Sequence, residues 1–293
     1  MFALLHDSRA TETTMHLTTV NGLACHTRLI PAPQGAPFLA FSNSLGTDFR
    51  IWDAVSERLA GRCAMLFYDS RGHGLSAIGE TPYRIETLAA DLAALIEQAA
   101  RGPAIVVGLS VGGMIAQQLA AARPDLVRAL VLCDTAHRIG TDELWNSRIA
   151  TVKTKGIAAM SDAILERWFT PAFRSPGNPL FAGCRAMLER QPAEGYAATC
   201  AALRDADLTH SSARLAVPTQ LVGGDQDGST PPDLVRQTAA LIPGARFELI
   251  ENCAHIPCVE QPERLAALIS GFVAGVVRGT AFPISCIRDI RQL

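Results

Sequence analysis

A serine flanked by glycines is the residue of this chain whose sequence context most clearly suggests a catalytic role. Residues 104–114 read AIVVGLSVGGM, so an apolar run ends at Ser110, with Gly108 two residues before it and Gly112 two residues after it. A serine in such a strand-to-helix turn takes a strained positive φ, and small residues at both flanking positions avoid a clash. The turn exposes the hydroxyl and leaves the Val111 N–H at a helix N-terminus, where it faces developing negative charge. The pattern predicts a serine nucleophile, although glycine and serine also favour ordinary turns.

A serine hydroxyl is unreactive near neutral pH and needs a base together with a group that orients the base. His255 follows a late strand pattern in RFELIENCAHIPC, and Asp227 follows another in TQLVGGDQDGSTPP. The order Ser, Asp, His along the chain is the one that a nucleophile after an early strand requires. Asp225 and Asp134 compete with Asp227 for the acid, and the motif GxxDxxTP favours Asp227. Each residue also has a purely structural interpretation, because Asp often caps turns and His often lies hydrogen-bonded in a core.

The second amide of an oxyanion hole is expected in the loop after the strand pattern at 38–43. That loop reads Asn43-Ser44-Leu45-Gly46. Alignment through the glycine makes the Leu45 N–H the donor that acts with the Val111 N–H. A backbone donor tolerates a change of side chain, so the unusual sequence of the loop does not exclude the hole.

The elements that must position these residues alternate between strand and helix patterns. A helical stripe at 87–100 separates two of the apolar runs, and Asn21-Gly22 lies at the centre of a hairpin pattern at 17–29. The alternation predicts an α/β fold with a mostly parallel, doubly wound sheet. The runs that read as strands buried on both faces are 38–43, 63–69, 104–110, 128–134, 219–225 and 246–252.

The alternation breaks after the sixth strand, and this break divides the chain. Residues 136–213 have helical or irregular patterns, which predicts a cap over the carboxyl ends of the strands, where ligands of open α/β sheets bind. The α/β core is expected in two segments, one before the cap (15–135) and one after it (214–277). An N-terminal extension (1–14) and a C-terminal tail (278–293) complete the predicted organisation.

Composition excludes several classes of function. The net charge of −2 offers no basic field for nucleic acid, and no apolar run reaches the length of about 20 residues that a membrane span needs. The eight cysteines are scattered without a CxxC pair, which is typical of reduced thiols in the cytoplasm. HxxxH and GxGxxG are absent as well, so we expect neither a metal nor a cofactor. The expected partner is a small molecule, and self-association into a homo-oligomer stays open.

Taken together, the motifs resemble the α/β-hydrolase superfamily over roughly residues 15–277, and within it the 3-oxoadipate enol-lactonases of aromatic catabolism. The segments that carry the resemblance are NSLGTD (43–48), YDSRGHGLS (68–76), GLSVGG (108–113), HRIGTDELWNSRI (137–149) and AHIPCVEQP (254–262). The resemblance implies an α/β-hydrolase fold and a carboxylic ester hydrolase of the β-ketoadipate pathway. Ser110, His255 and Asp227 would then open the ring of 3-oxoadipate enol-lactone to give 3-oxoadipate.

Such a substrate carries a free carboxylate, which implies a cation in a mostly apolar pocket. The candidates in the predicted cap are Arg138 and Arg148, with Trp145 one helical turn from Arg148. The arginines could equally be solvated, and Trp145 could simply pack the cap onto the core. A broad carboxylesterase, a C–C bond hydrolase and a ligand receptor on the same fold remain alternatives.

Overall fold

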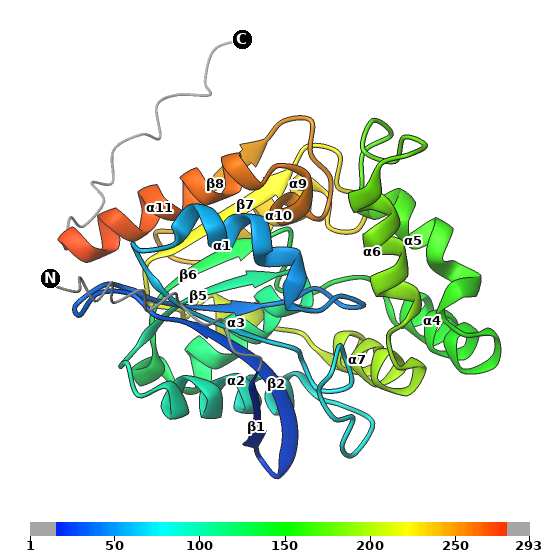
Figure 1. Cartoon of the computed structure of the whole chain (residues 1–293), viewed down its shortest axis with the longest axis horizontal. Helices are drawn as coiled ribbons and strands as arrows, with labels where there is room; N and C mark the ends of the chain where they lie inside the picture. The colour runs from blue at the N-terminus through cyan, green and yellow to red at the C-terminus, as the bar shows by residue number, and fades with distance from the viewer. Residues whose placement is uncertain (1–15, 280–293) are drawn as a thin grey trace, which may run out of the picture.

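The computed structural model describes residues 16–279. The predicted N-terminal extension and nearly all of the predicted C-terminal tail lie outside the described residues. An eight-stranded sheet in the order β1-β2-β4-β3-β5-β6-β7-β8 forms the centre of the molecule (Figure 1). Its strands are β1 (His16–Val20), β2 (Leu23–Ile30), β3 (Phe38–Ser42), β4 (Ala64–Tyr68), β5 (Ala104–Leu109), β6 (Val127–Cys133), β7 (Thr219–Gly224) and β8 (Arg246–Ile250).

The strand directions confirm the prediction of a mostly parallel sheet. Strands β3 to β8 run parallel to one another, whereas β1 pairs with β2, and β2 with β4, in antiparallel fashion. The hairpin between β1 and β2 turns at Asn21 and Gly22, whose φ angles are 48° and 80°. Positive φ at both positions matches the twist of the two strands, and Asn and Gly are the residues that tolerate it best.

Helices cover both faces of the sheet (Figure 1). Helices α1 and α11 pack together on one face, and α2 and α3 pack together on the other. The helices and short 3₁₀ turns of the core are η1 (Phe49–Trp52), α1 (Asp53–Leu59), α2 (Ile85–Ala99), α3 (Val111–Ala122), η2 (Pro124–Leu126), α9 (Pro232–Leu241), α10 (Pro257–Glu260) and α11 (Pro262–Arg278). Because both faces are covered, β3, β4, β5 and β7 are buried along their whole length.

Strand β8 corrects one expectation from the sequence. The pattern predicts burial on both faces, but β8 is the edge strand of the sheet, and Arg246 and Glu248 are exposed while Ile250 is buried. The run RFELI contains the period-two alternation of a half-exposed strand, which the short apolar pattern obscured.

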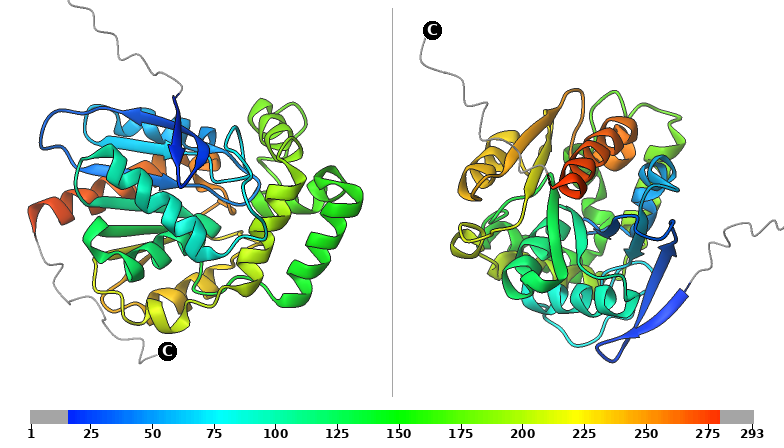
Figure 2. Two further views of the ribbon diagram at one scale, coloured as in Figure 1. Left: turned by 90° about the horizontal axis from the view of Figure 1, so that it is seen from below. Right: turned by 90° about the vertical axis from the view of Figure 1, so that its left-hand side faces the viewer.

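The stretch between β6 and β7 forms a separate group of helices at one end of the sheet (Figures 1 and 2). We call residues 136–213 the cap; no strand occurs in them, and all of them are described. The cap contains α4 (Asp142–Lys155), η3 (Ile157–Met160), α5 (Ser161–Trp168), α6 (Pro179–Glu189), α7 (Ala193–Asp205) and α8 (Thr209–Ser212). Among the described residues, no helix has the length and apolar character needed to cross a bilayer.

Candidate active site

The turn between β5 and α3 places Ser110 at the carboxyl end of the sheet in a strained backbone conformation. Ser110 has φ 58° and ψ −119°. A Cβ atom at Gly108 would lie 2.3 Å from the carbonyl oxygen of Gly112, and one at Gly112 would lie 2.2 Å from the carbonyl oxygen of Ser42. These contacts are with rigid backbone, so no side chain fits at either position. The glycines around Ser110 are therefore the steric condition for the turn.

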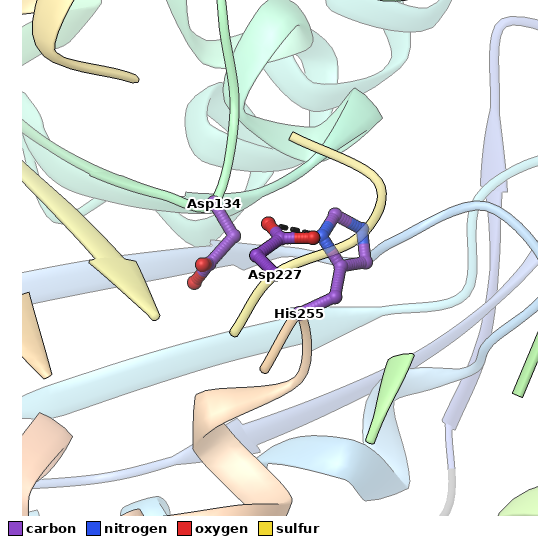
Figure 3. Close-up of side chains that lie close together, drawn as sticks. All are labelled: Asp134, Asp227 and His255. Atoms are coloured by element: carbon purple, nitrogen blue, oxygen red, sulfur yellow. Dashed lines mark hydrogen bonds and ion pairs between the residues drawn. The ribbon is translucent and has the colours of Figure 1, made fainter. Parts of the chain in front are cut away.

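His255 and Asp227 form a buried pair on the loops that follow β8 and β7. The distance from His255 Nδ1 to Asp227 Oδ2 is 2.8 Å, and both side chains are almost fully buried (Figure 3). The backbone N–H of His255 also donates to the carbonyl of Trp168, at the end of α5, over 3.1 Å. The loop that carries the histidine is thus tied to the cap.

The loop of Asp227 surrounds its carboxylate with donors. Oδ1 accepts the N–H groups of Ser229 and Thr230 at 2.6 and 3.0 Å, and Oδ2 accepts the hydroxyl of Thr230 at 2.6 Å. Burial alone would raise the pKa of Asp227, but the charge and hydrogen bond of His255, with the donors of Thr230 and Ser229, bring it below its usual value. Asp227 is therefore the residue that carries negative charge behind the imidazole.

The two backbone amides expected to form an oxyanion hole belong to Leu45, in the loop after β3, and to Val111, the first residue of α3. Within residues 16–279, neither the Leu45 N–H nor the Val111 N–H has a hydrogen-bond acceptor in the protein. The loop of Leu45 is held by Asn43, whose Nδ2 donates to the carbonyl of Tyr68 at 2.7 Å and whose Oδ1 accepts from Trp52 Nε1 at 2.9 Å. Asn43 is thus an anchor of the loop, and the free amides suit a developing oxyanion.

Ser110 and His255 open onto one cavity between the sheet and the cap. No hydrogen bond joins the two side chains in the described structure, and such a bond commonly tightens only when substrate is bound. The cavity holds about 50 Å³, far below the roughly 300–1,000 Å³ of a drug-sized pocket. Cap side chains must therefore move aside for a ligand larger than a few waters. The lining residues are Ser44, Leu45, Ser110, Ile139, Gly140, Leu144, Trp145, Arg148, Arg167, Trp168, Leu203, Ser229 and His255.

The arginines of the cap differ in where they lie. Arg148 lines the cavity, and its guanidinium carbon lies 5.1 Å from the centre of a ring of Trp145, which also lines it. Arg138 does not reach the cavity: it lies half-exposed at 3.6 Å from Asp142 and 3.7 Å from Asp207. The structure therefore corrects the choice of Arg138 as a pocket cation.

Arg167 is a cavity residue that the sequence reasoning missed. It lies near the end of α5, next to Trp168, and its backbone carbonyl accepts the N–H of Gly228 at 3.3 Å. This contact brings α5 against the loop of Asp227. Arg167 belongs to the site because α5 lies against this loop in the folded chain, although the two segments are far apart in the sequence.

Asp134, the rival for the acid, also lies in this region. Asp134, Asp227 and His255 are the one group of at least three His, Cys, Asp or Glu side chains in residues 16–279 whose ligand atoms lie within 4.8 Å of one another, as a metal site needs. The ring nitrogen and the carboxylate that would face a metal are already hydrogen-bonded to each other. The set therefore suits acid–base chemistry better than metal binding.

Comparison with known proteins agrees with this geometry. The model of the alpha/beta hydrolase family matches residues 35–268. The chain belongs to this family. 3-Oxoadipate enol-lactonase 2 of Acinetobacter baylyi is 33% identical to it over 227 residues, which are 78% of this chain and 85% of that protein. 3-Oxoadipate enol-lactonase 1 of the same organism is 30% identical over 247 residues, 84% of this chain and 92% of that protein.

Solved structures give the same picture for this hydrolase. The crystal structure of the enol-lactonase from Burkholderia xenovorans superposes with a TM-score of 0.85 at 34% sequence identity, covering 88% of this chain and 100% of that one. A thermophilic esterase from Thermogutta terrifontis superposes with a TM-score of 0.81 at 26% identity, covering 89% of this chain and 97% of that one. The fold class expected from the sequence is confirmed, and the chain is an ester hydrolase by its family and its relatives.

Proposed function

We propose that this hydrolase opens the ring of 3-oxoadipate enol-lactone to give 3-oxoadipate. The observation that carries the proposal is that Ser110 and His255 share one small cavity with two arginines, Arg148 and Arg167. The remaining walls are mostly apolar. A compact lactone with one free carboxylate suits this combination of side chains once the cap side chains have moved aside, and the relatives named as 3-oxoadipate enol-lactonases support the proposal.

The chemistry follows from the arrangement of the triad. His255 takes the proton of Ser110 as Oγ bonds to the lactone carbonyl carbon, and Asp227 stabilises the imidazolium. The Leu45 and Val111 amides donate to the oxyanion. Collapse breaks the ring C–O bond and releases an enolate. The proton that His255 took from Ser110 passes on to this leaving group, which becomes a ketone by protonation on carbon, and His255 is neutral again. A water activated by His255 then cleaves the acyl-enzyme and frees the second carboxylate.

The two arginines are proposed to hold the carboxylate that the substrate already carries. Neither has a carboxylate partner in the part of the chain that the structure describes, in contrast to Arg138. The half-buried Arg148 guanidinium contributes about 1.5–3 kcal/mol when it donates to a carboxylate in the cavity, whereas the exposed Arg167 competes with water and contributes about 1 kcal/mol or less. Arg148 is also oriented by Trp145, whose Nε1 donates to the carbonyl of Ile139 at 2.6 Å.

The test measures kcat/KM for the enol-lactone and for an uncharged p-nitrophenyl ester, with Ser110→Ala as the blank. Arg148→Ala is expected to lower kcat/KM for the lactone by about 10–100-fold, and Arg167→Ala, at an exposed position, by less than about tenfold. Each should change kcat/KM for the ester by less than about threefold. Arg138→Ala is the matched control and should change neither substrate. Wild-type turnover of the neutral ester above that of the lactone would instead support a broad carboxylesterase, in line with the thermophilic esterase among the similar structures.

A reducing compartment such as the cytoplasm fits the same proposal. The seven cysteines of the described residues are all buried thiols without a disulfide partner. Proteins of oxidising compartments more often use cysteines in disulfides.

A further inference from the structure

Asp134 occupies a special place behind the catalytic pair. It follows β6 directly and has φ 43°, in the left-handed region that Asp tolerates better than most residues. Its side chain is fully buried, and its Oδ1 accepts the N–H of Gly224, at the end of β7, at 2.7 Å. Its own N–H donates to the carbonyl of Val222 at 2.8 Å. These bonds fix Asp134 at the adjoining ends of β6 and β7, the strand before Asp227.

The close-up of the site shows the order of the three groups. Asp227 lies between Asp134 and His255, and only Asp227 is joined to the histidine by a hydrogen bond (Figure 3). Nevertheless, one oxygen of Asp134, one oxygen of Asp227 and one ring nitrogen of His255 all lie within 4.8 Å of one another. Asp134 is therefore close enough to act on the histidine by its charge.

Two buried carboxyl groups this close cannot both be ionised. Within the described residues, Asp134 Oδ2 is buried and has no hydrogen-bond donor, whereas the Asp227 carboxylate accepts four. Burial, and then the charge of Asp227, raise the pKa of Asp134 well above its usual range. The proton of the pair therefore resides on Asp134, where it turns Oδ2 into a donor beside Asp227.

Other titratable groups that face Asp134 keep it in this state. Glu260, on α10, also raises the pKa of Asp134, and three cysteine thiols lie around it. Burial raises the pKa of these thiols, so they stay uncharged near neutral pH. They are Cys133, Cys253 and Cys258.

We propose that Asp134 and Asp227 form a coupled acid pair that holds one negative charge behind His255, so that Asp134 supplies this charge when Asp227 cannot. The inference rests on the proposed Ser–His–Asp mechanism. In the native protein Asp134 is a positioning residue, because its neutral carboxyl group leaves the charge on Asp227. Loss of the Asp227 charge removes one of the two effects that keep Asp134 protonated and leaves the other, burial, so the pKa of Asp134 falls but stays above its usual value. Asp134 then releases its proton as pH rises and stabilises the imidazolium from the end of β6.

A double-mutant cycle tests the proposal. Its readout is kcat for the enol-lactone or the p-nitrophenyl ester, whichever the wild type turns over faster. Asp227→Asn is expected to lower kcat by about 10²-fold, less than the roughly 10⁴-fold that follows loss of the acid in a triad without a second carboxyl group. Asp134→Asn alone should lower kcat by less than about tenfold. The double variant should lose about 10⁴-fold, since no charge remains behind the histidine. A second cycle uses Asp227→Ala and Asp134→Ser. These substitutions remove each carboxyl group without introducing an amide that could bond to His255.

The pH profile separates this role from a merely structural one. The residual kcat of Asp227→Asn should rise with pH as Asp134 loses its proton, and the double variant should lack this rise. Asp225→Asn is the matched control, because Asp225 is an exposed acid of the same loop whose Oδ1 accepts the Cys253 N–H at 3.0 Å. It should keep the wild-type profile. Thermal unfolding of each variant shows whether it is folded.

Two outcomes would overturn the inference. One is an Asp227→Asn variant that is no more active than the double variant, and the other is an Asp134→Asn variant that loses about 10⁴-fold by itself. Neither outcome touches the proposed function as long as Ser110→Ala is inactive. Activity of Ser110→Ala near that of the wild type would instead remove the nucleophile on which both proposals depend.

Discussion

Residues 16–279 contain two buried His–Asp pairs that look alike, and only one of them shares a cavity with Ser110, the proposed nucleophile. In the first, His255 Nδ1 lies 2.8 Å from Asp227 Oδ2, and in the second, His26 Nδ1 lies 2.7 Å from Asp69 Oδ2. Both aspartates are buried. The hydrogen bond between ring and carboxylate is therefore not what makes a catalytic pair.

The contacts of the second pair indicate a structural role. Asp69 Oδ1 accepts the N–H of Phe49 and Oδ2 accepts the N–H of Leu75, each at 3.0 Å, so one carboxylate ties β2 to the loops after β3 and β4. The ring of His26 packs on Phe49 with a centroid distance of 4.7 Å. Each partner of Asp69 holds a piece of backbone in place.

The two aspartates also differ in how readily they carry charge. Burial raises the pKa of Asp69, and the donors of Leu75, His26 and Phe49 offset only part of this effect. For Asp227 the balance is reversed, and its pKa lies below the usual value. Asp227 is thus the better anion, although both side chains are buried.

The spaces beside the pairs differ in the same sense. His26 and Asp69 line a groove of about 800 Å³ next to α6, far larger than the cavity of Ser110. The groove does contain a thiol, Cys184, but burial raises its pKa to about 12, so the thiolate is scarce near neutral pH. Size alone would point to the wrong pocket. A strained serine, free amides and a charged acid distinguish the smaller one.

The largest expected effect comes from removing Ser110, the proposed nucleophile that shares a cavity with the first pair. Ser110→Ala should lower kcat by about 10⁶-fold, because the nucleophile and its base act as one unit. The fold should persist, since Ser110 contributes its backbone to the turn. Steady-state turnover and thermal unfolding measure the two effects. Activity within about tenfold of the wild type would show that the chemistry lies elsewhere.

Replacing the aspartate of the second pair is expected to reduce the stability of the protein rather than its activity. Asp69→Ala leaves the Phe49 and Leu75 N–H groups without an acceptor, so we expect the free energy of unfolding to fall by about 3 kcal/mol. The kcat of the folded variant should stay within about tenfold of the wild type. Denaturant titration and turnover give the two values. A loss of activity at unchanged stability would mean that the groove, too, is a catalytic site.

The smallest predicted difference concerns the pH dependence of stability. The contributions of Asp69 and Asp227 should change with pH in opposite directions. Asp69, with its raised pKa, keeps its proton in the folded state after the unfolded chain has lost it, so its stabilisation falls as pH rises through this window. Asp227, with its lowered pKa, contributes stability above its ordinary pKa and loses it as pH falls. Each unit of pKa displacement corresponds to about 1.4 kcal/mol.

Asn variants make these pH slopes measurable. The free energy of unfolding of the wild type minus that of Asp69→Asn should decrease with rising pH. The corresponding difference for Asp227→Asn should increase when both proteins also carry Asp134→Asn, so that Asp134 does not titrate. Denaturant titrations between about pH 3 and pH 7, around the ordinary pKa of a carboxyl group, record both. Slopes of the same sign would contradict the contrast between the two pairs.

The sequence alone determined the features of this protein that depend on near neighbours and on chain order. Gly108 and Gly112 mark the Ser110 turn because the clashes they prevent involve backbone close in the chain or in the next strand. Asp227 and His255 could be placed beside Ser110 because parallel strands bring their carboxyl ends to one edge. The strands of the core and the stretch without strands were predictable for the same reason.

Only the tertiary structure decided what depends on packing between distant segments. Arg148 and Arg167 line the cavity while Arg138 lies between Asp142 and Asp207, because the packing of the cap helices on the sheet determines which residues reach the cavity. The proton on Asp134 likewise follows from its burial beside Asp227, a residue far away in the chain. Local pattern specifies a turn or a strand, but solvent exclusion and the approach of two charges arise only when the chain is folded.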